Sequence, residues 1–250
     1  MKEKIIDLSK QFADNVNSVS AFFENNGKEF ESLYDSQTEL FNNHFPFVQD
    51  PYYVLKSHEQ IVLQTFYKAH NLIYTSYRLL LEGNYGASNM LIRGITEYLL
   101  IGKYFSVKKD LLLADKWLNG TQFDTYEKAI KYLIPSQKQI FHKFWCLCCN
   151  DNHAMAHSFQ VGFDIENSKI ALGETFARLT ILQICSYHLL GGHLLNGRLK
   201  YRSELWGAHK ERNSQLKSLI TGNISNLKSA LTKQGIELAK TYKSKWVFQK

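Results

Sequence analysis

Proline is scarce in this chain, with 3 residues among 250. Average usage would give about four times as many. Because proline removes a backbone donor and clashes with the preceding turn, its scarcity favours long helices. Long apolar runs are missing as well, since Arg93, Glu97 and Lys103 interrupt the most hydrophobic stretch, residues 90–105. A spanning helix needs roughly 20 apolar residues, so we expect no membrane segment.

Cysteine is also sparse, with 4 residues, of which Cys146, Cys148 and Cys149 are crowded together. The first residues, Met1 to Lys4, lead into a stretch that mixes charges with isoleucines, unlike the apolar core of a secretion signal. We therefore expect free thiols in a reducing compartment and a cytoplasmic location.

The motifs of several common enzyme classes are missing. The sequence contains no phosphate-binding glycine-rich loop, no dinucleotide fingerprint and no Gly-x-Ser-x-Gly elbow. No glutamate is followed three positions later by a histidine, which excludes the usual di-iron bundle signature. These absences remove many enzyme classes without indicating another. We expect no cofactor and leave open whether the chain is an enzyme.

Apolar residues recur every three or four positions along most of the chain, which is the spacing of one face of an α-helix. We predict an all-α helical bundle with long antiparallel helices, forming a single domain over residues 1–250 with its core at about 55–200. A long N-terminal helix is expected over 2–42 and a long basic helix over 203–250. The other expected helices span about 57–82, 85–105, 107–118, 122–133, 136–157 and 168–196, with a loop over 159–167.

Local signals predict how some of these helices begin and end. Ser57 is the expected N-cap of the second long helix, with Gln60 at the position that completes a capping box. Gly83-Asn84 is typical of a helix end, and so short a connection makes the flanking helices antiparallel neighbours. The helix at 168–196 is apolar nearly all round, which predicts a central position.

Positive charge is concentrated toward the C-terminus. From Arg198 onward the chain holds twelve Lys or Arg and three Glu, a net charge of +9, so residues 1–197 carry about −2 of the total +7. Such a basic face attracts phosphates by long-range steering. The alternative is an ordinary solvated helix face.

A narrow polar strip crosses the apolar helix expected at 85–105. Its members Asn89, Arg93 and Glu97 lie four residues apart and therefore share one face. Charges in apolar surroundings are costly unless they are paired, so one interpretation is a structural ion pair. The other is a site in which Arg93 binds an anion and Glu97 orients it, because the planar guanidinium matches phosphate and carboxylate oxygens.

A stripe of histidines and cysteines marks the helix expected at 136–157. At about 100° per residue its members fall on one face: His142, Cys146, Cys149, His153 and His157. The stripe could pack or form hydrogen bonds, supply catalytic histidines, or bind a metal. We expect no resident metal; if one is bound, its ligands would be His153, His157 and Cys149, completed from another helix or by a break in this one.

Residues 79–97 resemble a poorly characterised family of bacterial all-helical proteins. The shared pattern is a helix, a Gly-x-Tyr-Gly-Ala turn, here at 83–87, a helix carrying Arg-x-x-x-Glu, and a later histidine. The resemblance covers mainly residues 60–160. It implies a catalytic set of Arg93, Glu97, His153 and His157.

The same helical hairpin also resembles HEPN domains, which are dimeric helical ribonucleases or nucleotide-binding partners in toxin–antitoxin and phage-defence systems. Their catalytic pattern, an arginine and a histidine separated by four to six residues, matches Arg202 and His209 as a second candidate pair. Ser203 stands where that family often has a larger polar residue. Such a pair would act without metal, the histidine as general acid or base and the arginine on phosphate charge.

Three functions remain open from the sequence. The first is an RNA-acting or nucleotide-binding, HEPN-like component of a bacterial defence or toxin–antitoxin system, with a metal-independent ribonuclease as the expected activity if it is an enzyme. The second is a non-enzymatic interaction or regulatory protein, and the third is a metal-binding helical protein. The first implies an RNA or nucleotide ligand, a homodimer through the long helices and a protein partner encoded nearby.

Overall fold

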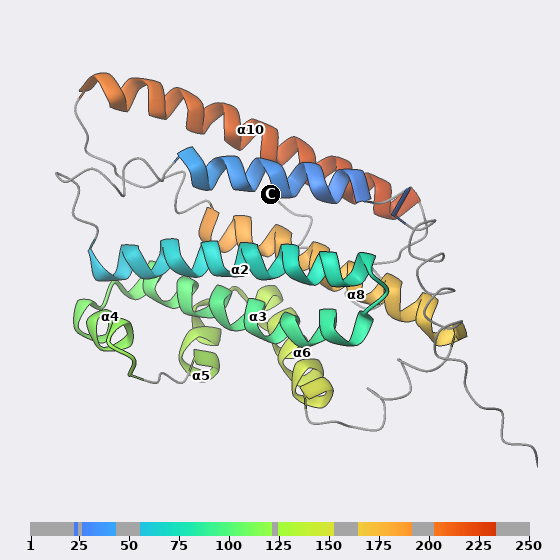
Figure 1. Ribbon diagram of the computed structural model, residues 1–250. Helices are drawn as coiled ribbons and strands as arrows, with labels where there is room; N and C mark the ends of the chain where they lie inside the picture. Colours follow the sequence, from blue (N-terminus) through green and yellow to red (C-terminus); the bar gives the residue numbers. More distant parts are fainter. Residues whose placement is uncertain are drawn as a thin grey trace, which may run out of the picture.

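The computed structural model describes residues 23–24, 27–43, 56–121, 125–152, 165–191 and 203–233. These residues form helices packed against one another and include no strand, which confirms the predicted all-α bundle (Figure 1). The rest of the helices predicted over 2–42 and 203–250 lies outside the described residues. Within the described ranges, no helix combines the length and the apolar character needed to cross a membrane.

The helices lie side by side in successive layers (Figure 1). At one side α10 (Ser203–Lys233) runs along a helix at 27–43, and α2 (Ser57–Leu81) and α8 (Ile165–Ser186) lie next to that helix. Beyond them comes α3 (Tyr85–Lys108). Three shorter helices lie on the far side of α3: α4 (Leu111–Leu118), α5 (Thr125–Ala129) and α6 (Pro135–Asn152).

The antiparallel hairpin of α2 and α3 is at the centre of the fold. It turns at Gly83, whose φ of 74° is a conformation that glycine adopts at little cost. Asn84 then caps α3 by accepting a hydrogen bond from the Ala87 amide over 3.2 Å. Where the helices cross, the hydroxyls of Ser76 and Ser88 lie 2.8 Å apart, so small side chains allow a close approach. The predicted turn and antiparallel pairing are confirmed.

α8 lies in the core, as its apolar sequence predicts. Every side chain from 175 to 187 except Arg178 is at least nine-tenths buried. Two buried glutamines join it to the helix at 27–43: Gln37 Nε2 donates to the Gln183 carbonyl over 3.0 Å, and Gln183 Nε2 donates to the Phe30 carbonyl over 3.3 Å. These hydrogen bonds fix the two helices in register within an otherwise apolar interior.

α10 packs antiparallel on the helix at 27–43. Its buried side chains recur every three or four positions and are Asn213, Leu216, Ile220, Ile224 and Leu227. At one end Asn43 Nδ2 donates to Asn213 Oδ1 over 2.9 Å, and at the other Asn223 Nδ2 donates to the Ser32 carbonyl over 2.8 Å. Between Asn213 and Leu227 the basic helix therefore docks on its own chain.

Some helix ends differ from the predictions. The N-cap of α2 is Lys56, whose backbone amide donates a hydrogen bond to Glu59 Oε2 over 3.0 Å. The capping box predicted from Ser57 was therefore wrong by one residue. The Ser57 hydroxyl instead contacts Asp115 of α4. α3 continues past residue 105 and ends at Lys108. α4 begins only at Leu111, and the Asp110 carboxylate caps it by accepting a hydrogen bond from the Leu113 amide.

Two later predictions also need correction. The region expected as one helix at 122–133 is α5 followed by a 3₁₀ turn, Ile130–Tyr132. α8 begins at Ile165, so the predicted loop was wrong over its last three residues. At its other end α8 continues into a π-helical turn, Tyr187–Gly191.

Candidate functional site

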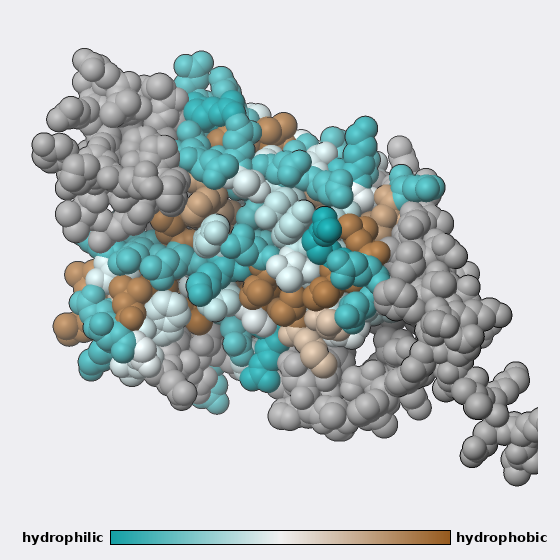
Figure 2. Space-filling model, viewed as in Figure 1, coloured by the Kyte–Doolittle hydropathy of each residue, from teal (hydrophilic) through white to brown (hydrophobic). Residues whose placement is uncertain are grey.

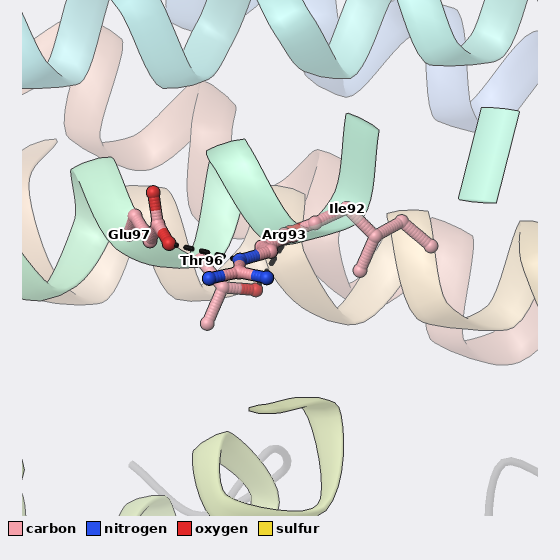
Figure 3. Close-up of polar contacts among 4 residues, drawn as sticks. All are labelled: Ile92, Arg93, Thr96 and Glu97. Atoms are coloured by element: carbon pink, nitrogen blue, oxygen red, sulfur yellow. Dashed lines mark hydrogen bonds and ion pairs between the residues drawn. The ribbon is translucent and has the colours of Figure 1, made fainter. Parts of the chain in front are cut away.

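The predicted pairing of Arg93 with Glu97 is present on α3 (Figure 3). Arg93 Nε donates to Glu97 Oε1 over 3.1 Å, one helical turn away. The two side chains are 36% and 37% exposed, so the pair lies at the surface of the bundle rather than in its core. Both charges keep contact with solvent, and a surface pair of this kind contributes little to stability.

The guanidinium of Arg93 also contacts α6. Its central carbon lies 5.3 Å from the centroid of the Trp145 ring, within the range of a cation–π interaction. Glu97 and Trp145 thus restrain the guanidinium from two sides. Its terminal nitrogens Nη1 and Nη2 make no hydrogen bond to the described residues, so the outer edge of the planar fork keeps its donors available.

One turn before Arg93, Asn89 connects α3 to α8. Its Nδ2 donates to the Thr175 hydroxyl over 3.0 Å, and its Oδ1 accepts from Arg178 Nη1 over 3.0 Å. Because Asn89 and Arg93 lie four residues apart, both arginines belong to the same side of α3. We call this set the three-helix junction: Asn89, Arg93 and Glu97 of α3, Trp145 of α6 and Arg178 of α8.

The His/Cys stripe begins beside this junction. On α6 the exposed side chains of His142 and Cys146 lie one turn apart, with 3.8 Å between His142 Nε2 and Cys146 Sγ. His142 precedes Trp145 by three residues, which puts the histidine and the tryptophan on neighbouring positions of the helix surface. A titratable group is therefore placed near the junction, although it was not among the predicted catalytic histidines.

The positions of several predicted site residues are not described by the structure. His153, His157 and Arg202 fall outside the described residues, and so does any contact they make with Arg93. Cys149 is on α6 and His209 on α10, but neither side chain is described. The predicted Arg-x-x-x-Glu arrangement is therefore observed, while its completion by a histidine and the second pair Arg202 and His209 stay predictions.

Sequence reasoning missed two members of the junction. Arg178 is the only charged residue between 175 and 187, and that interruption of an apolar helix was a usable signal. Trp145 carried no such signal, because its contact with Arg93 depends on how α6 approaches α3. Among the described residues, no three His, Cys, Asp or Glu side chains are grouped so as to hold a metal ion.

The arrangement suits recognition of an anion. Two arginines from different helices flank Asn89, and one of them is held in a fixed plane by an aromatic ring and a carboxylate. Guanidinium groups so held bind phosphate through paired N–H donors. Comparisons of the chain with protein families, with curated proteins and with solved structures found no match in any of the three.

Proposed function

We propose that this chain binds a phosphate group of RNA or of a nucleotide at the three-helix junction, as an HEPN-like component of a bacterial defence or toxin–antitoxin system. One observation carries the phosphate site. Arg93 is oriented by Glu97 and Trp145 while both its terminal nitrogens make no hydrogen bond to the described residues. Because the side chain is 36% exposed, a phosphate in solution can reach those donors.

Glu97 orients the Arg93 guanidinium but also weakens its attraction for an anion. Its carboxylate offsets part of the Arg93 charge and accepts the hydrogen bond from Arg93 Nε, the guanidinium nitrogen nearest the backbone. The outer edge, formed by Nη1 and Nη2, matches two oxygens of one phosphate. Arg178, held to Asn89 over 3.0 Å, adds a second positive charge on the same side of α3. The basic C-terminal part of the chain would raise the encounter rate with polyanions.

If the bound RNA is cleaved, the chemistry would need a general base close to the phosphate. His142 is the described histidine on the helix that supplies Trp145, and His153 and His157 follow it in the sequence. A histidine in this role would deprotonate a ribose 2′-hydroxyl, whose oxygen then bonds to the adjacent phosphorus as the bond from phosphorus to the 5′-oxygen breaks. The products would be a 2′,3′-cyclic phosphate and a 5′-hydroxyl that takes its proton from the protonated histidine or from water, and Arg93 would stabilise the charge on the phosphate oxygens. This route requires no metal, so it predicts cleavage that survives a chelator.

The test uses the purified full chain with total RNA and a transfer-RNA pool, with and without EDTA. Binding is followed by fluorescence anisotropy of a labelled single-stranded RNA at fixed salt, and cleavage by gel electrophoresis. Arg93→Ala is expected to weaken binding by about tenfold to a hundredfold, since a charge-assisted pair contributes roughly 1.5–3 kcal/mol. Arg78→Ala, which removes an exposed arginine of α2, is the matched control and should change little.

The variants also separate the candidate catalytic residues. His142→Ala, His157→Ala and His209→Ala should leave binding intact, and the one that abolishes cleavage identifies the base. Equal binding by wild type, Arg93→Ala and Arg78→Ala would overturn the phosphate site. Cleavage lost with EDTA would instead favour a metal-dependent role for the His/Cys stripe.

A second function, a non-enzymatic interaction protein, is favoured by one surface feature. Apolar side chains are exposed where α3 gives way to α4, and Figure 2 shows brown side chains at that end of the molecule. Leu112 is 78% exposed, and Val107 and Leu111 are exposed beside it in the sequence. Solvent-facing apolar residues grouped in this way are typical of protein contact surfaces. Folded protein that neither binds nor cleaves RNA would make this function the leading one.

A further inference from the structure

A cavity of about 510 Å³ opens between the helix at 27–43 and α2, away from the three-helix junction. Its size is that of pockets that bind small molecules in proteins. In Figure 2, side chains of intermediate hydropathy, drawn pale, gather over the region between these two helices. The lining residues are Tyr34, Thr38, Phe41, Asn42, Leu63, Gln64, Tyr67, His70 and Asn71.

Aromatic rings form the walls of this cavity. Tyr34 and His70 stack with their centroids 3.9 Å apart and their planes within 3° of parallel. Phe41 and Tyr67 stack with centroids 4.9 Å apart and an angle of 26° between planes. Tyr67 is nevertheless 46% exposed, which is unusual for so large a ring in a packed wall. The exposed ring leaves one aromatic face available beside the opening.

The cavity has a polar corner built from Thr38 and His70. The Thr38 hydroxyl donates its one proton to the Tyr34 carbonyl over 3.1 Å, and it lies 2.8 Å from His70 Nε2. Nε2 must then carry the proton of the neutral imidazole and donate it to Thr38. Nδ1 is left as a lone pair that is buried without a hydrogen-bond partner. Such an unsatisfied acceptor is costly in a folded protein.

No lining residue of this cavity is charged. Burial lowers the pKa of His70 to about 4, so its imidazole is neutral at physiological pH. Asn42, Gln64 and Asn71 are exposed, and their side-chain amides make no hydrogen bond to the described residues. The cavity thus offers aromatic faces and neutral donors and acceptors. A phosphate inside it would have no cationic partner, so an anion is excluded as the buried part of a ligand.

We propose that this aromatic cavity binds an uncharged planar heteroaromatic ring, the chemistry of a nucleobase, stacked against Tyr67 with its polar edge directed to the amides and to the Thr38–His70 corner. Stacking on tyrosine rewards a flat π-system, and amide side chains recognise ring nitrogens and exocyclic groups. A saturated apolar ligand would leave these polar groups unsatisfied. The site is separate from the three-helix junction and does not rest on the function proposed for Arg93.

The test measures binding of adenine and of cytosine to the full chain by isothermal titration calorimetry, with cyclohexanol as a saturated ring of similar size. Adenine and cytosine should bind saturably, and cyclohexanol should not. Tyr67→Ala should weaken adenine binding about tenfold, the effect typical of removing one stacking partner. Tyr98→Ala, on α3 and outside the lining, and Arg93→Ala should leave it unchanged.

A second measurement locates the ligand without any substitution. In NMR spectra of the wild-type chain, adenine should give intermolecular contacts to the ring protons of Tyr34, Tyr67 and His70. No saturable binding of either base would overturn the proposal. Equal binding of cyclohexanol would show a merely apolar cavity and overturn it as well. A loss of binding in Arg93→Ala, but not in Tyr67→Ala, would place the ring at the three-helix junction and reject the aromatic cavity.

Discussion

The Tyr77 hydroxyl lies 2.8 Å from the position that a Cβ atom on Gly27 would occupy. The same hydroxyl donates a hydrogen bond to Glu31 Oε1 over 2.9 Å, and the Tyr77 ring stacks on Phe30 with centroids 4.6 Å apart. Gly27 lies inside the long helix predicted over 2–42, where a glycine ordinarily weakens the helix. The structure gives this glycine another role, because only a residue without a side chain lets α2 approach here.

Gly27→Ala is expected to destabilise the protein by about 1–3 kcal/mol, the usual cost of forcing a methyl group into a packed interior. The new methyl would displace the Tyr77 hydroxyl and break its hydrogen bond with Glu31. Urea unfolding followed by circular dichroism measures the change. Gly222→Ala is the control, because a Cβ there meets nothing within 4 Å on α10. That variant should gain about 0.5–1 kcal/mol, and equal losses in both variants would contradict the steric explanation.

Asn223→Ala tests how α10 is held to the helix at 27–43. The Asn223 amide donates to the Ser32 carbonyl over 2.8 Å and to the Ser36 hydroxyl over 3.2 Å. Its loss leaves a half-buried carbonyl without this donor, so we expect a cost of about 1–2 kcal/mol in the free energy of unfolding.

Asn226→Ala is the matched control on the same helix, since Asn226 is exposed. Its effect should stay within about 0.5 kcal/mol, as is usual for surface substitutions. Hydrogen exchange gives an independent readout, because amides of α10 should exchange faster in Asn223→Ala than in wild type. Similar exchange in the two variants would mean that the apolar stripe of α10 alone fixes the contact.

Much of the fold could be predicted because local rules suffice for it. The apolar residues of α8 leave no polar face, so that helix had to be central. Gly83 offered the positive φ that ends α2, and the short turn then imposed antiparallel packing. The capping of α2 could not be predicted in the same way. Serine is a favoured N-cap residue, but the Ser57 hydroxyl contacts Asp115 of another helix. The helix instead begins with a hydrogen bond from the Lys56 amide to the Glu59 carboxylate.

In the candidate site, too, contacts within one helix could be predicted from the sequence, and contacts between helices could not. The pairing of Arg93 with Glu97 was predictable, since four residues of helix bring them together. Trp145 and Arg178 join them only through tertiary packing, and no periodicity reveals such contacts. The aromatic cavity was missed for that reason too. Tyr34 and His70 are far apart in sequence and stack only because two helices pack in one register.

Trp145→Ala should weaken RNA binding by about threefold to tenfold without unfolding the chain, because loss of the ring frees the Arg93 guanidinium to move. A cation–π contact at an exposed site contributes about 0.5–1 kcal/mol, and the disorder of Arg93 adds to this. Trp145→Phe retains an aromatic face and should restore most of the affinity. Fluorescence anisotropy at two salt concentrations measures both variants. If Trp145→Phe and Trp145→Ala bind equally weakly, the ring acts through packing rather than through Arg93.

Stability should fall in mild acid because of His70. Its pKa is about 4 in the folded protein, lowered by burial from the ordinary 6.5. Below about pH 6.5 the unfolded chain takes up a proton that the folded chain does not, so the free energy of unfolding decreases as the pH falls toward 4. The full difference corresponds to about 3 kcal/mol. The pKa of His58 is also lowered by burial, which adds a loss in the same direction.

His70→Phe isolates this contribution, because phenylalanine keeps a flat ring between Tyr34 and Phe66 but cannot be protonated. Thr38 can still donate to the Tyr34 carbonyl in this variant. We expect urea unfolding between pH 7 and 4.5 to show a shallower loss of stability in His70→Phe than in wild type. His142→Phe, the same substitution at an exposed histidine outside the cavity, is the control. Parallel curves for wild type and His70→Phe would mean that His70 is hydrated and titrates normally, and the polar corner of the aromatic cavity would then need a different description.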